Sequence, residues 1–98
     1  MKIIACQSPA DLKASEIASA NAIVMDGETY QNIGCVMPGA ANIIVSPDWE
    51  GDTPSGWFVF SHMGDAIRLA SSAGMEMMLV VGKDIRRVAI NAYGAEAR

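Results

Sequence analysis

The sequence predicts one α/β domain, a three-layer sandwich with a mostly parallel five-stranded sheet between two layers of helices. Five short apolar runs are continuous rather than alternating, which is typical of strands buried on both faces. Segments with helical spacing separate most of these runs, as expected for a parallel sheet with crossover helices. The chain has 98 residues and is 51% hydrophobic, so it is long enough for one hydrophobic core.

The first strand and helix are predicted from the opening residues. Met1–Cys6 is a short apolar run that polar residues end, so it forms the first buried strand. Ser8 is a good helix N-cap and Pro9 suits the first helical position, so a helix is expected from there to Ala20. The apolar run Ala22–Met25 is then the second strand.

Another helix and two more strands follow in the middle of the chain. Asp26 is expected to cap a short helix that ends at Gly34, because glycine readily adopts the left-handed conformation found after a helix. Asn42–Ser46 is the third strand. Residues 47–56 contain two prolines and two glycines, so they form a surface loop before the fourth strand, Trp57–Phe60.

The last part of the chain is predicted to contain two helices and a fifth strand. One helix runs from Ser61 to Gly74, the apolar run Met77–Val81 is the strand, and a final helix extends from Gly82 to Gly94. The tail Ala95–Arg98 is expected to fray. Residues 1–98 therefore form a single domain.

Charge and cysteine content exclude several function classes. The formal charge is −4 and the seven lysines and arginines are scattered, so no basic stripe could neutralise a nucleic-acid backbone. Cys6, Cys35 and the single histidine, His62, lack the spacing of a metal site or a disulfide framework. No apolar run reaches the length of a membrane span. We expect a cytoplasmic protein that binds neither nucleic acid nor membrane and holds no metal.

Several motifs resemble the central part of dihydrofolate reductase. They are SPADL, NAIVMDGETYQNIG and MPGAANIIVS, followed by WFVF, a helix with DAI and the strand MMLVVG. The family has a PADL segment, an apolar strand ending in Met, a helix ending in Ile-Gly and a PG-x-x-NI strand in this order. The resemblance implies the family's sheet, in which the strands lie in the spatial order four, three, two, five, one.

The resemblance also implies where a reductase site would lie. Asp11 matches the acidic residue that hydrogen-bonds the pterin in the family, although an ordinary carboxylate in a helix's first turn is the favoured explanation. Thr29, Ser46, Gly82 and Lys83 match positions that contact the nicotinamide cofactor. The alternative for Thr29 is a local role in the first turn of a helix. For Lys83, a solvent-exposed lysine at a helix start is the more common explanation.

The sequence departs from the family at several binding positions. The loop that closes over the nicotinamide in the family is missing between Cys6 and Ser8. The arginine that holds the 2′-phosphate gives way to the turn Asp26–Glu28, whose two carboxylates would repel a phosphate. Ala40 stands where the family has an arginine for the folate carboxylate. The family's later strands are expected to be missing, because the chain ends soon after Gly94.

Two functions follow as alternatives. The favoured one is a non-catalytic dihydrofolate reductase-like module that binds another protein or itself and uses no cofactor. A trimmed copy of a metabolic enzyme suggests an origin in a phage or mobile element. The alternative is a minimal reductase that uses NADPH or NADH, relies on Asp11 and Thr29, and is completed by dimerisation.

The first strand is the expected contact surface of a homodimer. In the family's arrangement it would pair with a later strand that the sequence lacks, so it would be an exposed edge. This edge is apolar apart from one lysine, and the predicted interface consists of Lys2, Ile3, Ile4 and Ala5. The alternative is that the tail 95–98 folds over the edge and leaves a monomer.

Overall fold

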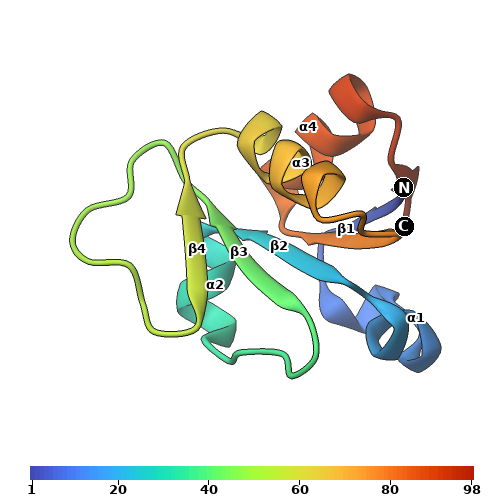
Figure 1. The fold of residues 1–98 in the computed structure, drawn as a ribbon, viewed down its shortest axis with the longest axis horizontal. Helices are drawn as coiled ribbons and strands as arrows, with labels where there is room; N and C mark the ends of the chain where they lie inside the picture. The colour runs from blue at the N-terminus through green and yellow to red at the C-terminus, as the bar shows by residue number, and fades with distance from the viewer.

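A fully parallel sheet of six strands forms the centre of the computed structural model, which describes residues 1–98 (Figure 1). The strands lie in the order β4-β3-β2-β5-β1-β6. Their bounds are β1 (Lys2–Cys6), β2 (Ala22–Asp26), β3 (Ala41–Val45), β4 (Trp57–Phe60), β5 (Met77–Val81) and β6 (Glu96–Ala97). The predicted fold class and the order of the first five strands are confirmed. The predicted number of strands is wrong, because β6 is added beside β1.

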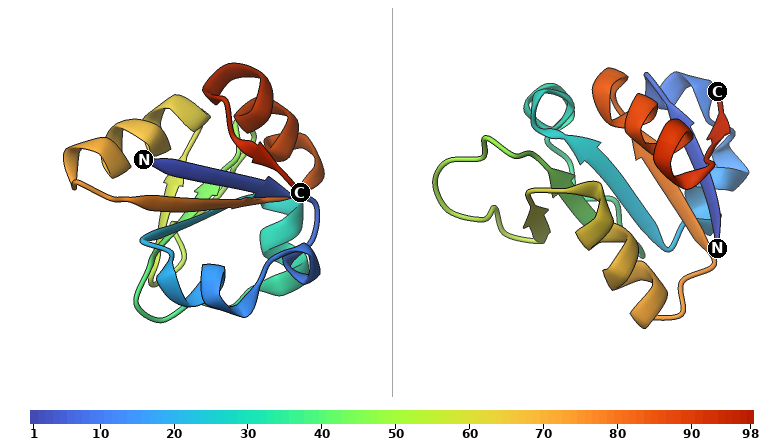
Figure 2. Two further views of the ribbon diagram at one scale, coloured as in Figure 1. Left: turned by 90° about the vertical axis from the view of Figure 1, so that its right-hand side faces the viewer. Right: turned by 90° about the horizontal axis from the view of Figure 1, so that it is seen from above.

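Helices cover both faces of the sheet, and Figure 2 shows the layer on either side of it. One layer contains a 3₁₀ helix (Pro9–Asp11), α1 (Ala14–Ser19) and α2 (Gly27–Ile33). The opposite layer contains α3 (Met63–Ser72) and α4 (Lys83–Tyr93). The longest helix, α4, has 11 residues, and none of the helices combines the length and apolar character needed to cross a membrane.

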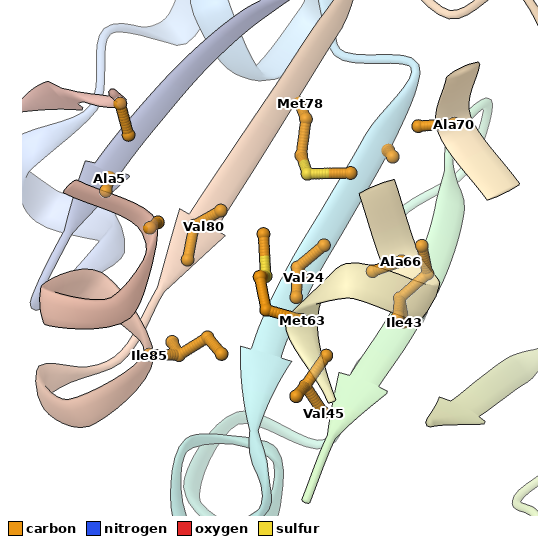
Figure 3. Packing of buried hydrophobic residues seen from close by; sticks show 13 residues of the cluster. Ala5, Val24, Ile43, Val45, Met63, Ala66, Ala70, Met78, Val80 and Ile85 are labelled. Carbon is orange, nitrogen blue, oxygen red and sulfur yellow. The ribbon is translucent and has the colours of Figure 1, made fainter. Parts of the chain in front are cut away.

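Each face of the sheet has its own hydrophobic core, because successive side chains of a strand point to opposite faces. Val24 and Val80 lie on the face of α3 and α4, where they pack in one cluster with Met63 (Figure 3). Ile23 and Leu79 belong to the cluster on the other face. All of these side chains are buried, which explains why the apolar runs in the sequence are continuous.

The connection from β1 to β2 contains two short helices, so the prediction of one helix over Ser8–Ala20 is wrong. The 3₁₀ helix Pro9–Asp11 ends at Leu12, whose φ of −99° and ψ of 146° are extended. A new helix, α1, begins two residues later, and the N–H of Lys13 donates to Glu16 Oε1 at 2.8 Å. This contact stabilises a second helix start in place of a continuous helix.

The tail Ala95–Arg98 packs against the domain, so the expectation that it frays is wrong. Gly94 adopts a φ of 65°, and the chain beyond it runs parallel to β1. The Arg98 N–H donates to the backbone oxygen of Ala5 at 2.8 Å. The Arg98 guanidinium donates to both carboxylate oxygens of Glu16, at 2.8 and 2.6 Å. This bidentate ion pair joins the tail to α1.

Strand β1 lies inside the sheet, so the prediction that it forms an exposed edge is wrong. β6 pairs with Ile4 and Ala5, and both of these residues are fully buried. Lys2 is exposed and Ile3 is half-buried. The backbone of Ile4 and Ala5 is therefore not available for edge-to-edge pairing with a second copy while β6 is in place.

Acid is expected to destabilise the fold through Glu16. Hydrogen bonds from the Arg98 guanidinium, followed by the one from the Lys13 N–H, lower the pKa of Glu16 from 4.5 to about 2. A carboxyl whose pKa is lowered by folding adds stability above its ordinary pKa, and this stability is lost as the pH falls from 4.5 towards about 2. Thermal unfolding followed by circular dichroism should therefore show a steeper fall of Tm in this window for the wild type than for Glu16→Gln.

The control for this measurement is Glu76→Gln, which changes an exposed carboxylate that forms no ion pair. Its Tm should follow the wild type across the whole pH range. Parallel curves for the wild type and Glu16→Gln would contradict the role assigned to the Glu16–Arg98 pair.

Candidate functional site

The candidate site lies beyond the carboxyl ends of β2 and β5. These strands are neighbours in the sheet, but β2 leads into α2 on one face and β5 leads into α4 on the other. In open parallel sheets, ligands bind in the crevice at such a topological switch point. The residues at this point are Asp26, Gly27 and Gly82.

The side chain of Asp26 occupies the space between the two strand ends. Its Oδ1 accepts a hydrogen bond from the Thr29 N–H at 2.8 Å, which caps α2 as predicted. The rest of the carboxylate lies against Gly82, because a Cβ on Gly82 would be 2.8 Å from Asp26 Cγ and 2.8 Å from Thr29 Oγ1. Gly82 is buried and its N–H donates to Cys6 O at 3.0 Å. The space beside Gly82 at the switch point is therefore occupied by the side chains of Asp26 and Thr29.

A large hollow of about 420 Å³ opens beside this junction, on the face of α3 and α4. Its apolar lining consists of Val45, Met63, Ile85 and Val88. Figure 3 shows Val45, Met63 and Ile85 together at this end of the sheet. Its acidic lining consists of Asp26, Glu28, Asp48 and Asp84.

A second depression of about 460 Å³ adjoins the hollow and shares part of its lining. Its own lining residues are Gln31, Trp49 and Glu50. The residues that it shares with the first hollow are Gly27, Glu28, Ser46 and Asp48. Tyr30 contacts Trp49 edge to face, with ring centroids 5.6 Å apart, and contacts Trp57 in the same way at 4.9 Å. These contacts hold the base of the loop 46–56, which projects beyond β4 (Figure 1). We call the hollow and the depression together the acidic crevice.

The opposite face has a much smaller hollow of about 50 Å³ between the first two helical segments and the sheet. Small-molecule sites usually measure roughly 300–1,000 Å³. All of the side chains that line it are apolar. They are Pro9, Leu12, Ile17, Ile23, Met25, Ile33, Met37, Leu79 and Val81. This hollow is therefore too small for a ligand of that class.

The predicted cofactor residues are only partly brought together. Thr29 and Gly82 are in contact at the switch point, and Ser46 lines both parts of the acidic crevice. Lys83 is exposed at the start of α4 and lines neither part. Asp11, the predicted pterin ligand, is exposed in the 3₁₀ helix and lines neither the crevice nor the small apolar hollow.

Sequence reasoning identified the acidic turn at Asp26 but missed the carboxylates that gather with it. Asp48 follows the last residue of β3 by three positions, and Asp84 follows the last residue of β5 by three positions. The carboxyl ends of parallel strands lie at the same edge of a sheet, so acidic residues just after them meet there. This spacing was the signal in the sequence that could have predicted the crevice.

The thiol of Cys6 and the imidazole of His62 lie in different surroundings. Burial raises the pKa of the Cys6 thiol to about 11, and the negative charge of Asp11 adds to this effect. The thiol donates weakly to the backbone oxygen of Val80 at 3.6 Å, so it remains protonated at neutral pH. His62 is exposed at the N-terminus of α3, on the wall of the acidic crevice.

Comparison with known proteins identifies the family. No curated protein matches the sequence. The chain is similar to the crystal structure of a proposed riboflavin biosynthesis protein from Shewanella sp. PV-4, with a TM-score of 0.65 and 12% identity over 98% of this chain and 72% of the other. At this identity the two proteins share the fold. The family model described as dihydrofolate reductase matches residues 2–94. The chain therefore belongs to the dihydrofolate reductase family.

Proposed function

We propose that this chain is a non-catalytic member of its family that acts by binding another protein. The observation that carries the proposal is the position of the Asp26 carboxylate, which fills the space beside Gly82 at the switch point. The resemblance implies that the turn after the fifth strand approaches the cofactor's pyrophosphate. In this chain, a phosphate at that turn would meet a carboxylate instead of open space.

The charge of the acidic crevice also opposes a dinucleotide. Glu28, Asp48 and Asp84 line the same hollow as Asp26, and no lysine or arginine lines it. At about 6 Å and an effective dielectric constant near 20, each carboxylate opposes a unit negative charge by about 3 kcal/mol before salt screening. A micromolar affinity corresponds to only about 8 kcal/mol.

The substrate side of the fold supports the same proposal. The apolar hollow of about 50 Å³ is far smaller than a site for a bicyclic pterin ring would be. Asp11 is exposed to water and lines none of the hollows, so it does not face a pocket in which it could donate a proton to a bound ring. Ala40 offers no charge for a folate carboxylate.

A protein partner suits the surface that remains. The acidic crevice is wide, and apolar side chains such as Val88 and Trp49 line it. Broad, shallow surfaces with exposed apolar groups and charged rims are typical of protein interfaces. The partner is another protein or a second copy of this chain, and in the second case the contact must use a surface other than the covered strand β1.

A minimal reductase is the second candidate, and the contact between Thr29 and Gly82 favours it. Both residues match cofactor positions of the family and meet at the switch point, beside Ser46 in the crevice wall. This function would require Asp26 to leave its place and a second copy of the chain to complete the site. NADH would then suit the acidic turn better than NADPH, because it lacks the 2′-phosphate.

The direct test of the two candidates is turnover. Purified protein mixed with dihydrofolate and NADPH, or with dihydrofolate and NADH, should show no loss of absorbance at the nicotinamide band above a protein-free blank. An active dihydrofolate reductase assayed in parallel confirms that the reagents work. Turnover that is present in the wild type and disappears in Asp11→Asn would overturn the proposal and establish the reductase.

A further inference from the structure

We infer that the acidic crevice receives the side chain of a lysine or arginine from a basic segment of a partner protein. This inference rests on the proposed function, because it names the kind of partner that a non-catalytic, protein-binding chain would have. It depends on the charge, the lining and the openness of the crevice.

The charge of the crevice is concentrated and of one sign. Five of the chain's eleven acidic residues line it, and none of its seven lysines and arginines does. The five carboxylates come from three separate segments of the chain, and they are Asp26, Glu28, Asp48, Glu50 and Asp84. A potential this negative attracts a cationic group and favours its approach from solution.

The lining beneath these carboxylates suits a long basic side chain rather than a bare ion. Val45, Met63 and Ile85 provide an apolar floor on which the methylene groups of lysine or arginine could pack. Trp49 lines the adjoining depression and is held by its edge contact with Tyr30. A fixed indole beside carboxylates is a favourable neighbour for a guanidinium.

The distribution of the carboxylates disfavours a metal ion. No group of three or more His, Cys, Asp or Glu side chains converges closely enough to hold one. Four of the five acidic side chains are spread along the two adjoining hollows, and the fifth, Asp26, is engaged in capping α2. Such a distribution suits the charged end of a long, flexible lysine or arginine side chain better than a metal ion.

A partner protein is the expected source of that cation, rather than a free polyamine. Both parts of the crevice are open to solvent, so a small ligand would bury little of its surface there. A basic side chain presented by a protein would gain additional affinity from contacts around the crevice. The hollow and the depression of the acidic crevice could each accommodate one side chain of the same basic segment.

The experiment is a titration of the ¹⁵N-labelled protein with an acetylated and amidated hexa-arginine peptide, at about 150 mM salt to screen distant charges. Amide shifts in the turn 26–29 and in the loop 46–50 report binding. Asp48→Lys reverses a charge in the crevice, and Glu76→Lys reverses an exposed charge at the opposite end of the sheet. Both variants change the net charge by the same amount, so only the local effect of the charge differs.

We expect the wild type to bind the peptide, Asp48→Lys to weaken binding by about tenfold or more, and Glu76→Lys to change it by less than about twofold. Absence of binding by the wild type, or an equal loss in both variants, would overturn the inference. Binding of spermine as tightly as the peptide would also overturn it, in favour of a small organic cation.

A parallel titration with NADPH separates this inference from the proposed function. If neither the peptide nor NADPH shifts the crevice amides, only the inference about the basic partner fails. If NADPH shifts the crevice amides and the hexa-arginine peptide does not displace it, both the inference and the proposed non-catalytic function fail. Melting curves of both lysine variants establish that any loss of binding is not a loss of the fold.

Discussion

Replacing Gly82 with alanine is expected to destabilise the domain by about 2–6 kcal/mol. The residue has a φ of 136°, which is unfavourable for any side chain and accounts for about 1–3 kcal/mol. The new Cβ would also overlap the Asp26 carboxylate and lie 2.8 Å from Thr29 Oγ1, and such overpacking adds about 1–3 kcal/mol. This is a large share of the roughly 5–15 kcal/mol of a typical domain, so urea unfolding should show a much lower midpoint.

Two companion variants separate the two causes. Gly51→Ala introduces a Cβ at a φ of 89° with no atom within 4 Å, so it should show only the backbone effect of about 1–3 kcal/mol. Asp26→Gly removes the carboxylate and should lose only a few tenths of a kcal/mol as an N-cap. In the Gly82→Ala background it should restore part of the lost stability. Equal effects of Gly82→Ala and Gly51→Ala would contradict the contact between Asp26 and Gly82.

Asn42→Ala is expected to destabilise the domain by about 2–4 kcal/mol. The side chain is 2% exposed, and its Oδ1 accepts from the Met37 N–H at 2.8 Å. Its Nδ2 donates to the backbone oxygens of Met37 at 3.1 Å and Ala40 at 3.0 Å. Removing it takes the partners from three partly buried backbone groups, and a backbone group left unsatisfied away from water costs about 1–3 kcal/mol.

The measurement for this second prediction is again urea unfolding, with Asn91→Ala as the control. Asn91 is exposed on α4, where alanine is at least as favourable as asparagine, so this variant should be neutral or slightly stabilising. A loss below about 1 kcal/mol for Asn42→Ala would show that the turn 36–41 does not depend on these hydrogen bonds.

The sequence predicted the five long strands well because each is a continuous run of mostly apolar residues. Met77–Val81 and Trp57–Phe60 have the predicted bounds, and the cap at Asp26 and the end of α2 at Gly34 are also where the residue types indicated. These features are local, since a run of apolar residues or a capping side chain acts within a few positions. The resemblance to the family supplied the order of the strands.

The features that sequence reasoning missed depend on contacts between distant residues. The tail covers β1, as the alternative for residues 95–98 had it, but a sixth strand was not predicted there. β6 has only two residues and no apolar pattern, and it is held by the pair between Arg98 and Glu16. Nothing in the sequence near either residue indicates this partner. The same holds for the contact of Asp26 with Gly82, because the cap was predictable while the neighbour of its second oxygen was not.

The central claim is that the Asp26 carboxylate occupies the space beside Gly82 and prevents a dinucleotide from binding there. Titrating NADPH into the wild type and following Tm tests this claim most directly. The account predicts no change, because Asp26 occupies the space beside Gly82 and the crevice repels phosphate. Asp26→Gly opens this space, so any weak rise in Tm with NADPH in the wild type should be compared with the rise in this variant. A ligand at one hundred times its Kd stabilises a protein by about 2.7 kcal/mol, equivalent to about 10–20 °C for a domain of this size. A rise of this kind in the wild type would contradict the account.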